Sequence, residues 1–463
     1  MNVIIINILL LIIPILKEAN ALKILFVQQH YLYFGSHFGF TLHLAKFLAE
    51  DDGHEVHMLI PIRDKNYKLA DKNEEVRLNV RYFMPKTPMP QTLIDVNALS
   101  IEHDKIYLDI ANDFELMDKL RSEKFDVGIT EAFRLTGYSL AIFHLLQIPA
   151  TIATHSHAMA PFHLYLLGVL SKMKPGMPEF LSSGEDRLGL LNFKSREVRE
   201  KQLKLKREKD VDYQKLAEEK YALNTFPSWV EMFKSTRFFF LNSLPEVDFA
   251  QFKIVESIEK TNSLINLTLG TKEGVILVSF GTVVDSLFPT SSHIIEALVE
   301  TMERFPNYLF IWKQPKGDLP ILKEFKLENV VLQNWINQKE ILAHPKTMAF
   351  VSHCGMNSVM EGTFYGVPMV CMPFFGDQYY NAELLAIQKI GLVIETKNDK
   401  QTIQKELNLA LSTALGLMKR SEEHFDLDKL KSVSMEIRQN NIAKTISNAM
   451  KTIEKEINEK KRQ

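Results

Sequence analysis

The chain has 463 residues, of which 46% are apolar and 24% are charged, and its formal net charge is −2 at neutral pH. This length exceeds one ordinary hydrophobic core and predicts two or three domains, while the composition excludes a disordered chain. A charge so close to zero provides no field that would attract a phosphate backbone, so nucleic acid is not an expected partner.

The first 21 residues differ from the rest of the chain. An apolar run from Ile4 to Leu16 is too short to cross a membrane and is followed by the small-x-small tripeptide 19–21. Residues 1–21 are therefore predicted to be a secretory signal peptide, although no Lys or Arg precedes the run. The alternatives are an N-terminal strand or an uncleaved anchor. The favoured prediction places the protein in the secretory pathway, either in the ER lumen or secreted.

The segment after residue 21 has the pattern of a βαβ unit. Leu22–Val27 is predicted to be a buried strand, Phe38–Ala49 a helix, and Glu55–Ile60 the next strand. Further apolar runs typical of strands are Phe125–Thr130 and Pro149–Ala153. Strands that alternate with helices predict a parallel sheet with helices on both faces.

Residues 194–220 are dominated by Lys, Glu, Arg and Asp, which predicts a solvated helix or connector. Asp210 and Asp212 within it have the spacing of a metal-binding carboxylate pair. No strand precedes this pair and its neighbours are charged, so a solvated helix face is the favoured interpretation.

The alternation of strands and helices begins again at Gly274. A strand is predicted at Val275–Phe280 and an amphipathic helix at Ser291–Arg304. Four further strands are expected at Tyr308–Trp312, Asn329–Gln333, Thr347–Ser352 and Val367–Met372. The second half is therefore a second doubly wound α/β domain, and open sheets of this kind bind ligands at the carboxyl ends of their strands.

These patterns divide the chain into five segments. They are a signal peptide at 1–21, an N-terminal domain at 22–250, a linker at 251–273, a C-terminal domain at 274–415 and C-terminal helices at 416–463. Apolar residues at helical spacing between Ile442 and Ile457 predict an amphipathic final helix. No apolar run of membrane-spanning length follows the signal, and the C-terminus of this chain carries none.

The richest run of polar residues follows the strand predicted at Thr347–Ser352. His353 can donate a hydrogen bond, and Gly355 permits close backbone approach. Asn357 or Ser358 is expected to cap the next helix, whose free N–H groups and dipole suit a phosphate.

Two carboxylates extend this polar stretch. Glu361, one turn into the helix, could accept hydrogen bonds from ribose hydroxyls. A second cluster, Gly376-Asp377-Gln378, follows the next buried strand.

The order and spacing of these residues resemble the signature of the UDP-glycosyltransferase family over about fifty residues. The matching positions are Trp335, Gln338, His353, Gly355, Asn357, Ser358, Glu361, Gly362, Gly366, Val367, Pro368, Pro373, Gly376, Asp377, Gln378 and Asn381. The likeness is good from 275 to 395 and weak over 22–250. It implies the α/β architecture called GT-B, in which two Rossmann-like, doubly wound parallel-sheet domains face each other and C-terminal helices cross back to the first domain.

The resemblance implies a role for each position of a donor site in the C-terminal domain. Trp335 should stack on uracil and Gln338 should bind its edge, while Glu361 should bind the ribose. Asp377 and Gln378 should bind the sugar hydroxyls. The diphosphate is assigned to His353, Asn357 and Ser358, with Gly355 allowing close approach and with Gly281 and Thr282 of the preceding loop nearby.

The N-terminal domain is expected to bind the acceptor and to supply the catalytic base. Ser36 can cap the helix that follows it, so His37 would lie in the first turn, where the positive helix end keeps an imidazole neutral. The family has its catalytic histidine in this Ser-His context, oriented by an aspartate after a mid-domain strand. Here Glu131 takes that place with one methylene more, and Arg134 stands where many relatives carry another acid.

The implied reaction is the inverting transfer of a hexose or hexuronic acid from a UDP-sugar to a hydroxyl of a small lipophilic acceptor. No metal or other cofactor is expected. Peripheral membrane association and homo-oligomerisation both remain open.

Two alternatives are a catalytically inactive UDP-sugar or lipophile-binding homologue and a nucleotide-sugar epimerase. Glu131, Arg134 and a 248–272 segment that lacks the family's proline-rich, double-glycine linker motivate the first alternative. The signature from Trp335 to Gln378 argues against the second.

Histidines and cysteines outside the signature's assigned roles are given structural interpretations. His155, His157 and His163 have irregular spacing and no accompanying cysteine, which favours a pocket-lining or exposed position over a zinc site. Cys354, where relatives commonly have glycine, and Cys371 lie beside or within strand-like runs. They are expected to be two buried thiols rather than a bridge.

Overall fold

A computed structural model gives the fold of this protein. It describes residues 2–5, 21–28, 35–62, 67–69, 72–86, 105–131, 138–156, 163, 166, 193–242, 270, 272–281, 292–313, 328–418, 425–439 and 442–462. The chain divides into two compact units. Unit 1 contains Met1–Lys172, Leu191–Ser243 and Asn441–Gln463, and unit 2 contains Met173–Leu190 and Leu244–Asn440.

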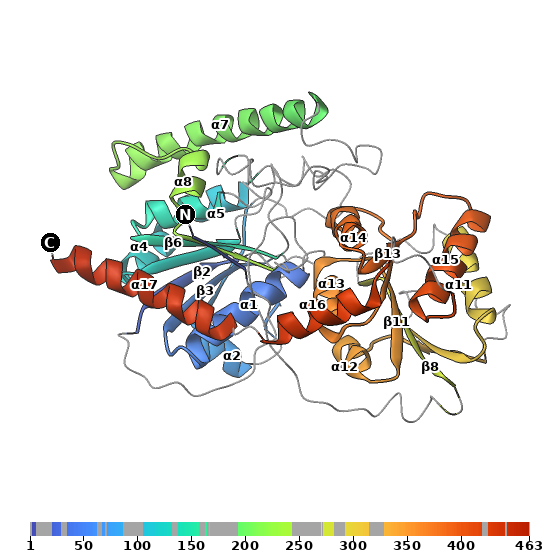
Figure 1. Ribbon diagram of the computed structural model, residues 1–463. Coiled ribbons are helices and arrows are strands. Elements are labelled where there is room, and N and C mark those ends of the chain that lie inside the picture. Colours follow the sequence, from blue (N-terminus) through green and yellow to red (C-terminus); the bar gives the residue numbers. More distant parts are fainter. Residues whose placement is uncertain are drawn as a thin grey trace. The chain divides into compact units, whose positions relative to one another are not determined.

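Unit 1 is built on a parallel sheet in the order β1-β7-β6-β5-β2-β3-β4 (Figure 1). Its strands are β1 (Asn2–Ile5), β2 (Lys23–Val27), β3 (Glu55–Pro61), β4 (Val80–Phe83), β5 (Val127–Glu131), β6 (Ala150–His155) and β7 (Phe238–Leu241). Its helices are α1 (Gly35–Glu50), α2 (Lys72–Arg77), α4 (Phe114–Ser122), α5 (Ser139–Leu145), α7 (Phe193–Tyr221), α8 (Trp229–Ser235) and α17 (Ile442–Arg462). Chain order reverses where β2 lies between β3 and β5, and such a switch point is where doubly wound sheets place their ligands.

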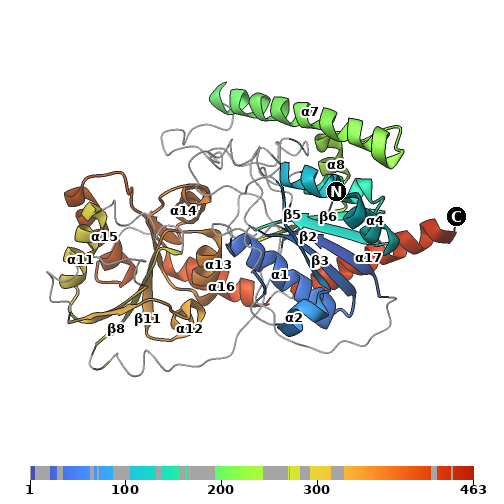
Figure 2. The same ribbon diagram turned by 180° about the vertical axis from the view of Figure 1, so that it is seen from behind.

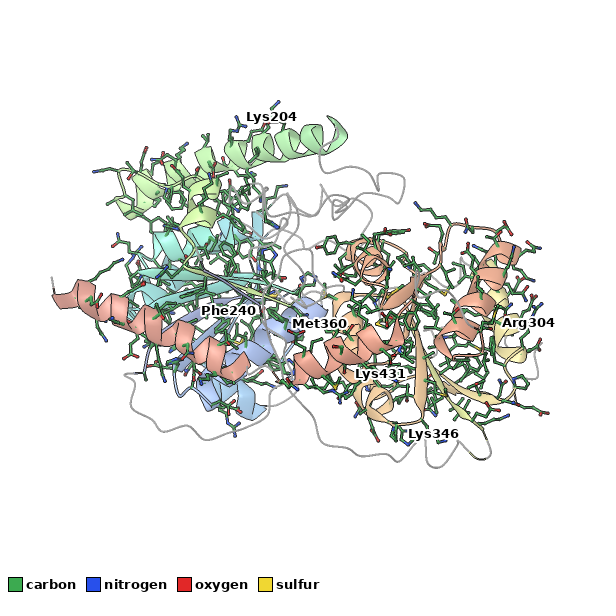
Figure 3. All side chains as sticks on the ribbon, viewed as in Figure 1. Lys204, Phe240, Arg304, Lys346, Met360 and Lys431 are labelled. Carbon is green, nitrogen blue, oxygen red and sulfur yellow. A yellow bond between two sulfur atoms is a disulfide. The ribbon has the colours of Figure 1, made fainter. Side chains whose placement is uncertain are left out.

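The strands of unit 1 form because their apolar side chains are covered on both faces. Helices α1 and α2 lie on one face of the sheet, and α5 and α8 lie on the other with α7 beyond them (Figures 1 and 2). All four residues of β7 are buried, including Phe240, whereas Lys204 on α7 points into solvent (Figure 3). A near-continuous apolar strand is what a parallel sheet with two covered faces requires.

Strand β1 lies within the segment predicted to be a signal peptide. It pairs in parallel with β7, from Asn2 opposite Phe238 to Ile5 opposite Leu241. An N-terminal strand is the alternative that the sequence left open for this segment. Cleavage after residue 21 would remove β1 and leave β7 at the edge of the sheet, so the signal peptide stays a prediction.

Unit 2 contains a six-stranded parallel sheet in the order β10-β9-β8-β11-β12-β13. Its strands are β8 (Gly274–Ser279), β9 (Tyr308–Lys313), β10 (Val330–Gln333), β11 (Thr347–Ser352), β12 (Met369–Cys371) and β13 (Gly391–Val393). Its helices are α11 (Ser292–Glu303), α12 (Gln338–Ala343), α13 (Met356–Tyr365), α14 (Asp377–Ile387), α15 (Lys400–Ala414) and α16 (Leu427–Gln439). The two Rossmann-like sheets confirm the predicted fold class, and the strands predicted from apolar runs occur within two residues of their expected bounds.

The last two helices belong to different units. In unit 2, α16 packs on α13, and both Ser434 and the Arg438 guanidinium donate to the Phe364 carbonyl. The final helix α17 is part of unit 1, where Arg237 donates to Glu456 from two guanidinium nitrogens, Nε and Nη2. The buried face of α17 carries Ile446, Ala449, Met450, Ile453 and Ile457. Among the residues that the structure describes, no helix is both long enough and apolar enough to cross a bilayer.

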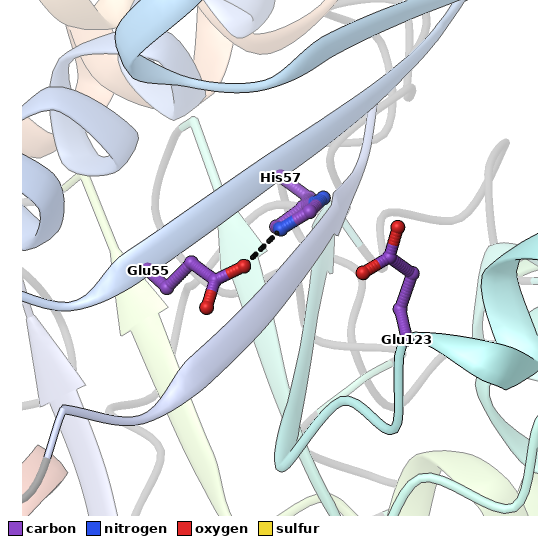
Figure 4. Close-up of side chains that lie close together, drawn as sticks. All are labelled: Glu55, His57 and Glu123. Atoms are coloured by element: carbon purple, nitrogen blue, oxygen red, sulfur yellow. Dashed lines mark hydrogen bonds and ion pairs between the residues drawn. The ribbon is translucent and has the colours of Figure 1, made fainter.

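A cluster of titratable groups lies at the amino ends of β2 and β3 in unit 1 (Figure 4). His57 Nε2 lies 2.7 Å from a Glu55 oxygen, and Glu123 is close to both residues. The Lys23 ammonium joins Glu55 at 3.0 Å and Glu123 at 2.6 Å, and Arg81 also binds Glu123. Hydrogen bonds from Lys23 and Arg81 lower the pKa of Glu123 to about 2. These cations already neutralise the cluster, so we assign it a structural role.

A glycine in β5 tests the packing of the sheet against α5. A Cβ atom at Gly128 would lie 2.4 Å from Cγ of the buried Phe143 ring, so Gly128→Ala should destabilise unit 1 by about 1–3 kcal/mol through overpacking. Gly39 in α1 has no atom within 4 Å of its Cβ position, and Gly39→Ala should stabilise the helix by about 0.5–1 kcal/mol. Thermal unfolding of both variants measures the contrast, and equal effects would contradict the described packing.

Candidate functional site

The carboxyl ends of β2, β5 and β6 carry a cluster of polar side chains in unit 1. Glu131 ends β5, and its side chain is only 3% exposed. His37, in the first turn of α1, places Nδ1 2.7 Å from Oε1 of Glu131. Ser156, directly after β6, donates to the same oxygen from Oγ at 2.7 Å and from its backbone N–H at 3.1 Å. Gln28, at the end of β2, donates to the other Glu131 oxygen at 3.3 Å.

These contacts determine which nitrogen of His37 is basic. A carboxylate only accepts hydrogen bonds, so the 2.7 Å contact with Glu131 requires the proton on Nδ1. In the neutral ring Nε2 then keeps its lone pair and can take a proton from a bound molecule. Ser156 Oγ lies 2.6 Å from Nδ1, on the side opposite the reactive nitrogen. The His37 side chain is 16% exposed, so the ring is held in place and still reaches the surface.

The sequence-predicted cap of α1 needs a correction. Helix α1 begins at Gly35, so Ser36 is inside the helix rather than before it. His37 nevertheless lies in the first turn, where the helix dipole disfavours an imidazolium.

In unit 2, His353 follows the end of β11 and lies between two glycines. A Cβ atom at Gly281 would lie 2.9 Å from the ring, and one at Gly355 would lie 2.6 Å from Nε2. Only a residue without a side chain leaves room for the imidazole at these two positions. Burial lowers the pKa of His353 to about 4, partly opposed by the charge of Asp377. Within the described part of the chain, its buried Nδ1 has no hydrogen-bond partner.

The start of α13 differs from the sequence-based expectation. The expected cap was Asn357 or Ser358, but α13 begins at Met356 and its N-cap is Gly355, with no capping side chain. Asn357 and Ser358 are therefore inside the first turn, and the capping prediction was wrong. Gly355 offers no capping side chain, and the positive end of α13 is a suitable place for an anion.

The residues assigned to the nucleoside are Trp335, Gln338 and Glu361. Trp335 lies between β10 and α12 with 78% of its surface exposed, which is unusual for an indole. Gln338 donates from Nε2 to Glu361 at 2.8 Å and to Ser358 Oγ at 3.2 Å. Burial raises the pKa of the Glu361 carboxyl. The structure thus brings Gln338 and Glu361 into contact, and Trp335 is three residues before Gln338 in the chain.

Asp377 and Gln378 begin helix α14. Gln378 is buried, and its side-chain oxygen accepts from the Phe374 and Phe375 N–H groups at 2.8 and 3.2 Å. Asn381 donates from Nδ2 to Asp377 Oδ2 at 2.8 Å and to the Cys354 carbonyl at 3.0 Å. The Asn381 amide therefore connects the start of α14 to the loop that contains His353.

The two cysteines contradict the expectation of free thiols. Cys354 and Cys371 form a disulfide, with α-carbons 5.4 Å apart. Neighbouring parallel strands bring them together, because Ser352 of β11 pairs with Cys371 of β12. Composition and spacing did not show that these two strands are adjacent.

Other sequence-based interpretations have varied outcomes. Asp210 accepts hydrogen bonds from Tyr138 and from the Trp229 backbone, and Asp212 pairs with Lys209. His155 and His163 are both buried, with ring centroids 4.7 Å apart in an edge contact, so exposure was wrong for these two. The positions Thr282, Arg134, His157 and most of the 251–273 linker lie outside the described residues.

The chain is similar to known proteins. A family profile described as "UDP-glucoronosyl and UDP-glucosyl transferase" matches residues 257–425. UDP-glucuronosyltransferase 3A1 of Bos taurus is 26% identical over 457 residues, which covers 89% of this chain and 83% of that protein. The putative UDP-glucuronosyltransferase ugt-50 of Caenorhabditis elegans is 28% identical over 312 residues, or 63% of this chain and 57% of that protein.

The sequence likeness identifies residues 257–425 as a UDP-glycosyltransferase domain. The matched profile region contains every donor-site residue that the sequence signature assigned to unit 2. Anthocyanidin 3-O-glucosyltransferase of Solanum melongena is 41% identical over 133 residues, or 27% of this chain and 29% of that enzyme.

Solved structures show the same fold in other glycosyltransferases. The chain aligns with Phytolacca americana UGT2, complexed with UDP-2fluoro-glucose and pterostilbene, at a TM-score of 0.60 and 17% identity, covering 94% of this chain and 100% of that one. A glycotransferase of kitacinnamycin gives a TM-score of 0.62 at 16% identity, covering 94% and 99%. Both are GT-B proteins, and this UDP-glycosyltransferase therefore has the GT-B fold.

Sequence analysis of this UDP-glycosyltransferase missed Ser156 and Gln28. Both lie directly at the carboxyl ends of strands that flank β5 in the sheet, which is the available signal. The residue types of Ser156 and Gln28 alone did not indicate that either side chain would contact Glu131.

The low pKa of His353 predicts a pH dependence of stability. Between pH 6.5 and 4 the unfolded chain takes up a proton that the folded ring refuses, so falling pH costs stability up to about 3 kcal/mol from this group. His353→Gln should therefore become more stable relative to wild type as pH falls through this window, and the difference should be constant above pH 7. Thermal unfolding of the two proteins from pH 7.5 to 4.5 measures it. A difference that is independent of pH would contradict the burial of this ring.

Proposed function

We propose that this UDP-glycosyltransferase transfers a hexose or hexuronic acid from a UDP-sugar to a hydroxyl of a small lipophilic acceptor, with inversion at the anomeric carbon. The observation that carries the proposal is the hydrogen bond between His37 Nδ1 and Glu131, which makes Nε2 the basic nitrogen of the neutral ring. A base of this kind is what an acceptor hydroxyl needs before it can attack a sugar.

The proposed reaction proceeds in one displacement. His37 Nε2 takes the proton of the acceptor hydroxyl, and the oxygen forms a bond to the anomeric carbon. The bond between that carbon and the diphosphate oxygen breaks on the opposite side, so the configuration inverts and UDP leaves. Glu131 stabilises the imidazolium that forms. A positioned base typically contributes about a hundred- to ten-thousandfold in rate.

Unit 2 is proposed to hold the donor. The exposed indole of Trp335 would stack on uracil, with Gln338 at its edge and Glu361 on the ribose. The uncapped start of α13 and the unpaired Nδ1 of His353 would bind the diphosphate. Asp377 and Gln378 would bind the sugar hydroxyls.

We also propose that no metal ion or other cofactor takes part. The charge that develops on the departing diphosphate would be stabilised by the dipole and N–H groups at the start of α13. Activity measured in the presence of a chelator tests this proposal.

The acceptor and donor classes are supported by the relatives. The Solanum melongena relative is named for an anthocyanidin, and the Phytolacca americana structure contains pterostilbene. Both are small phenols, which supports a hydroxyl of a small lipophilic molecule as the acceptor. The relatives include both glucosyl- and glucuronosyltransferases, so UDP-glucose and UDP-glucuronate are the donors to test. The secretory pathway is the proposed location, on the basis of the predicted signal peptide.

The inactive-homologue alternative was motivated partly by the longer side chain of Glu131. In the structure that side chain reaches His37 at hydrogen-bond distance, so the additional methylene does not break the pair. No observation among the described residues favours the inactive form.

The catalytic role of His37 predicts a large and specific loss. His37→Ala should lower kcat/KM by about a hundred- to ten-thousandfold, because the reaction loses its general base. His43→Ala is the matched control, since this exposed histidine lies on the same helix, and its activity should remain near wild type. UDP release would be measured with UDP-glucose and UDP-glucuronate, a panel of phenols, and EDTA present.

Three outcomes would contradict parts of this account. Undiminished turnover by His37→Ala would remove the base assignment, and loss of wild-type activity in EDTA that Mg²⁺ restores would remove metal independence. Wild-type protein that binds UDP without releasing it from either donor with any acceptor in the panel would favour the inactive binder.

The stacking role of Trp335 predicts a change in nucleotide binding. Trp335→Ala should weaken UDP binding by about 1–3 kcal/mol, the usual value of base stacking on an aromatic ring. Met435→Ala on α16 is the control, because it removes another exposed apolar side chain of unit 2 and should leave the Kd unchanged. Isothermal titration with UDP measures both, and equal Kd values for the two variants would reject the stacking assignment.

A further inference from the structure

We propose that the Cys354–Cys371 disulfide is a positioning element of the donor site, which holds the diphosphate loop in a backbone conformation that the loop would not otherwise keep. The inference rests on the proposed function of unit 2 as the UDP-sugar site. It assigns Cys354 and Cys371 a role through their neighbours, because neither is proposed to contact the donor.

The disulfide lies where the sheet stops holding the two strands together. The β11–β12 ladder ends at the pair Ser352 and Cys371, followed by one backbone bond from Met372 N–H to the Ser352 carbonyl at 2.8 Å. Cys354 is two residues beyond the end of this ladder, next to His353 and Gly355. The bridge is therefore the next connection between the two strand ends, and Cys354 directly precedes Gly355, the N-cap of α13.

The backbone of Cys354 supplies the second observation. Its φ is +57°, in the left-handed region that residues with a Cβ atom disfavour. Glycine would adopt this conformation without that cost. Here the covalent link to Cys371 holds a non-glycine residue in the conformation, and both cysteines are fully buried.

The third observation is a path from this loop to the sugar-binding residues. The Cys354 carbonyl accepts a hydrogen bond from Asn381 Nδ2 at 3.0 Å, and the same amide donates to Asp377 at 2.8 Å. Asn381 is fully buried, so it cannot move freely if the carbonyl turns away. A change in the Cys354 backbone would displace both His353, on one side, and the Asp377 carboxylate, on the other.

The bridge also makes the donor site dependent on the compartment in which the protein folds. A disulfide forms in the oxidising secretory pathway, to which the predicted signal peptide would direct this chain, and two thiols would persist in the cytosol. Protein produced by secretion should contain no free thiol under denaturing conditions, whereas its reduced form should contain both.

Three variants separate the bridge from the side chain at position 354. Cys371→Ala removes the bridge and leaves a Cβ atom at 354, as does the double variant Cys354→Ala with Cys371→Ala. The double variant Cys354→Gly with Cys371→Ala removes the bridge and also the steric penalty. All three lose the cross-link, so a merely stabilising role would affect their thermal unfolding together and their donor binding alike.

The decisive measurement is the Kd of UDP and of UDP-glucose by isothermal titration, with thermal unfolding as a parallel readout. The two variants with a Cβ atom at 354 should bind about five- to thirtyfold more weakly, which corresponds to losing the left-handed conformation. The glycine variant should bind within about threefold of wild type. The loss should be larger for UDP-glucose than for UDP, because Asp377 is displaced too.

The outcomes distinguish this inference from the proposed function. If wild type binds UDP and all three variants bind equally well, or if the glycine variant is as weak as the alanine variants, the positioning role is wrong. Two free thiols in the secreted wild type would also overturn it. If wild type itself does not bind UDP, the proposed function fails and the inference fails with it.

Discussion

The arrangement of unit 1 depends on one buried carboxylate. Glu131 lies at the end of β5, out of water, and four donated hydrogen bonds from His37, Ser156 and Gln28 converge on it. A buried charge is tolerated only when such donors surround it. The donors come from α1 and from the two strands beside β5, so the sheet order itself places them. The donors that orient Glu131 therefore also stabilise it, because removing any one of them leaves this buried carboxylate with fewer hydrogen bonds.

Unit 2 is built on the same kind of parallel sheet, but it is proposed to bind the donor. In the proposed donor site, an incoming diphosphate would meet the start of α13, whose N-cap Gly355 offers no side chain, and the ring of His353, whose Nδ1 has no partner among the described residues. The two glycines leave room for the His353 ring, and we propose that the disulfide and the Asn381 amide hold this loop in place. Preorganised donors of this kind lose little energy to rearrangement when charge develops.

Much of this could be predicted from the sequence, for identifiable reasons. Buried parallel strands are continuous apolar runs, so β8, β9 and β11 were located closely. Glu131 directly follows one predicted strand, and His37 lies at the start of the helix that follows another. Contacts that depend on strand order were not accessible. Ser156 could be placed beside Glu131 only once β6 was known to flank β5, and the disulfide required the adjacency of β11 and β12. The cap of α13 was misplaced because Gly355 can begin a helix without offering a side chain.

The most direct test of the account is the protonation state of His37 itself. Nitrogen NMR of histidine-labelled protein, with His37→Ala used to assign the signal, reports which ring nitrogen carries the proton. The account predicts a neutral ring with the proton on Nδ1 near pH 7, and a mixture of tautomers in Glu131→Gln, since an amide can donate as well as accept. A ring protonated on Nε2 in the wild type, or a tautomer unchanged in Glu131→Gln, would contradict the claim that Glu131 makes His37 the base.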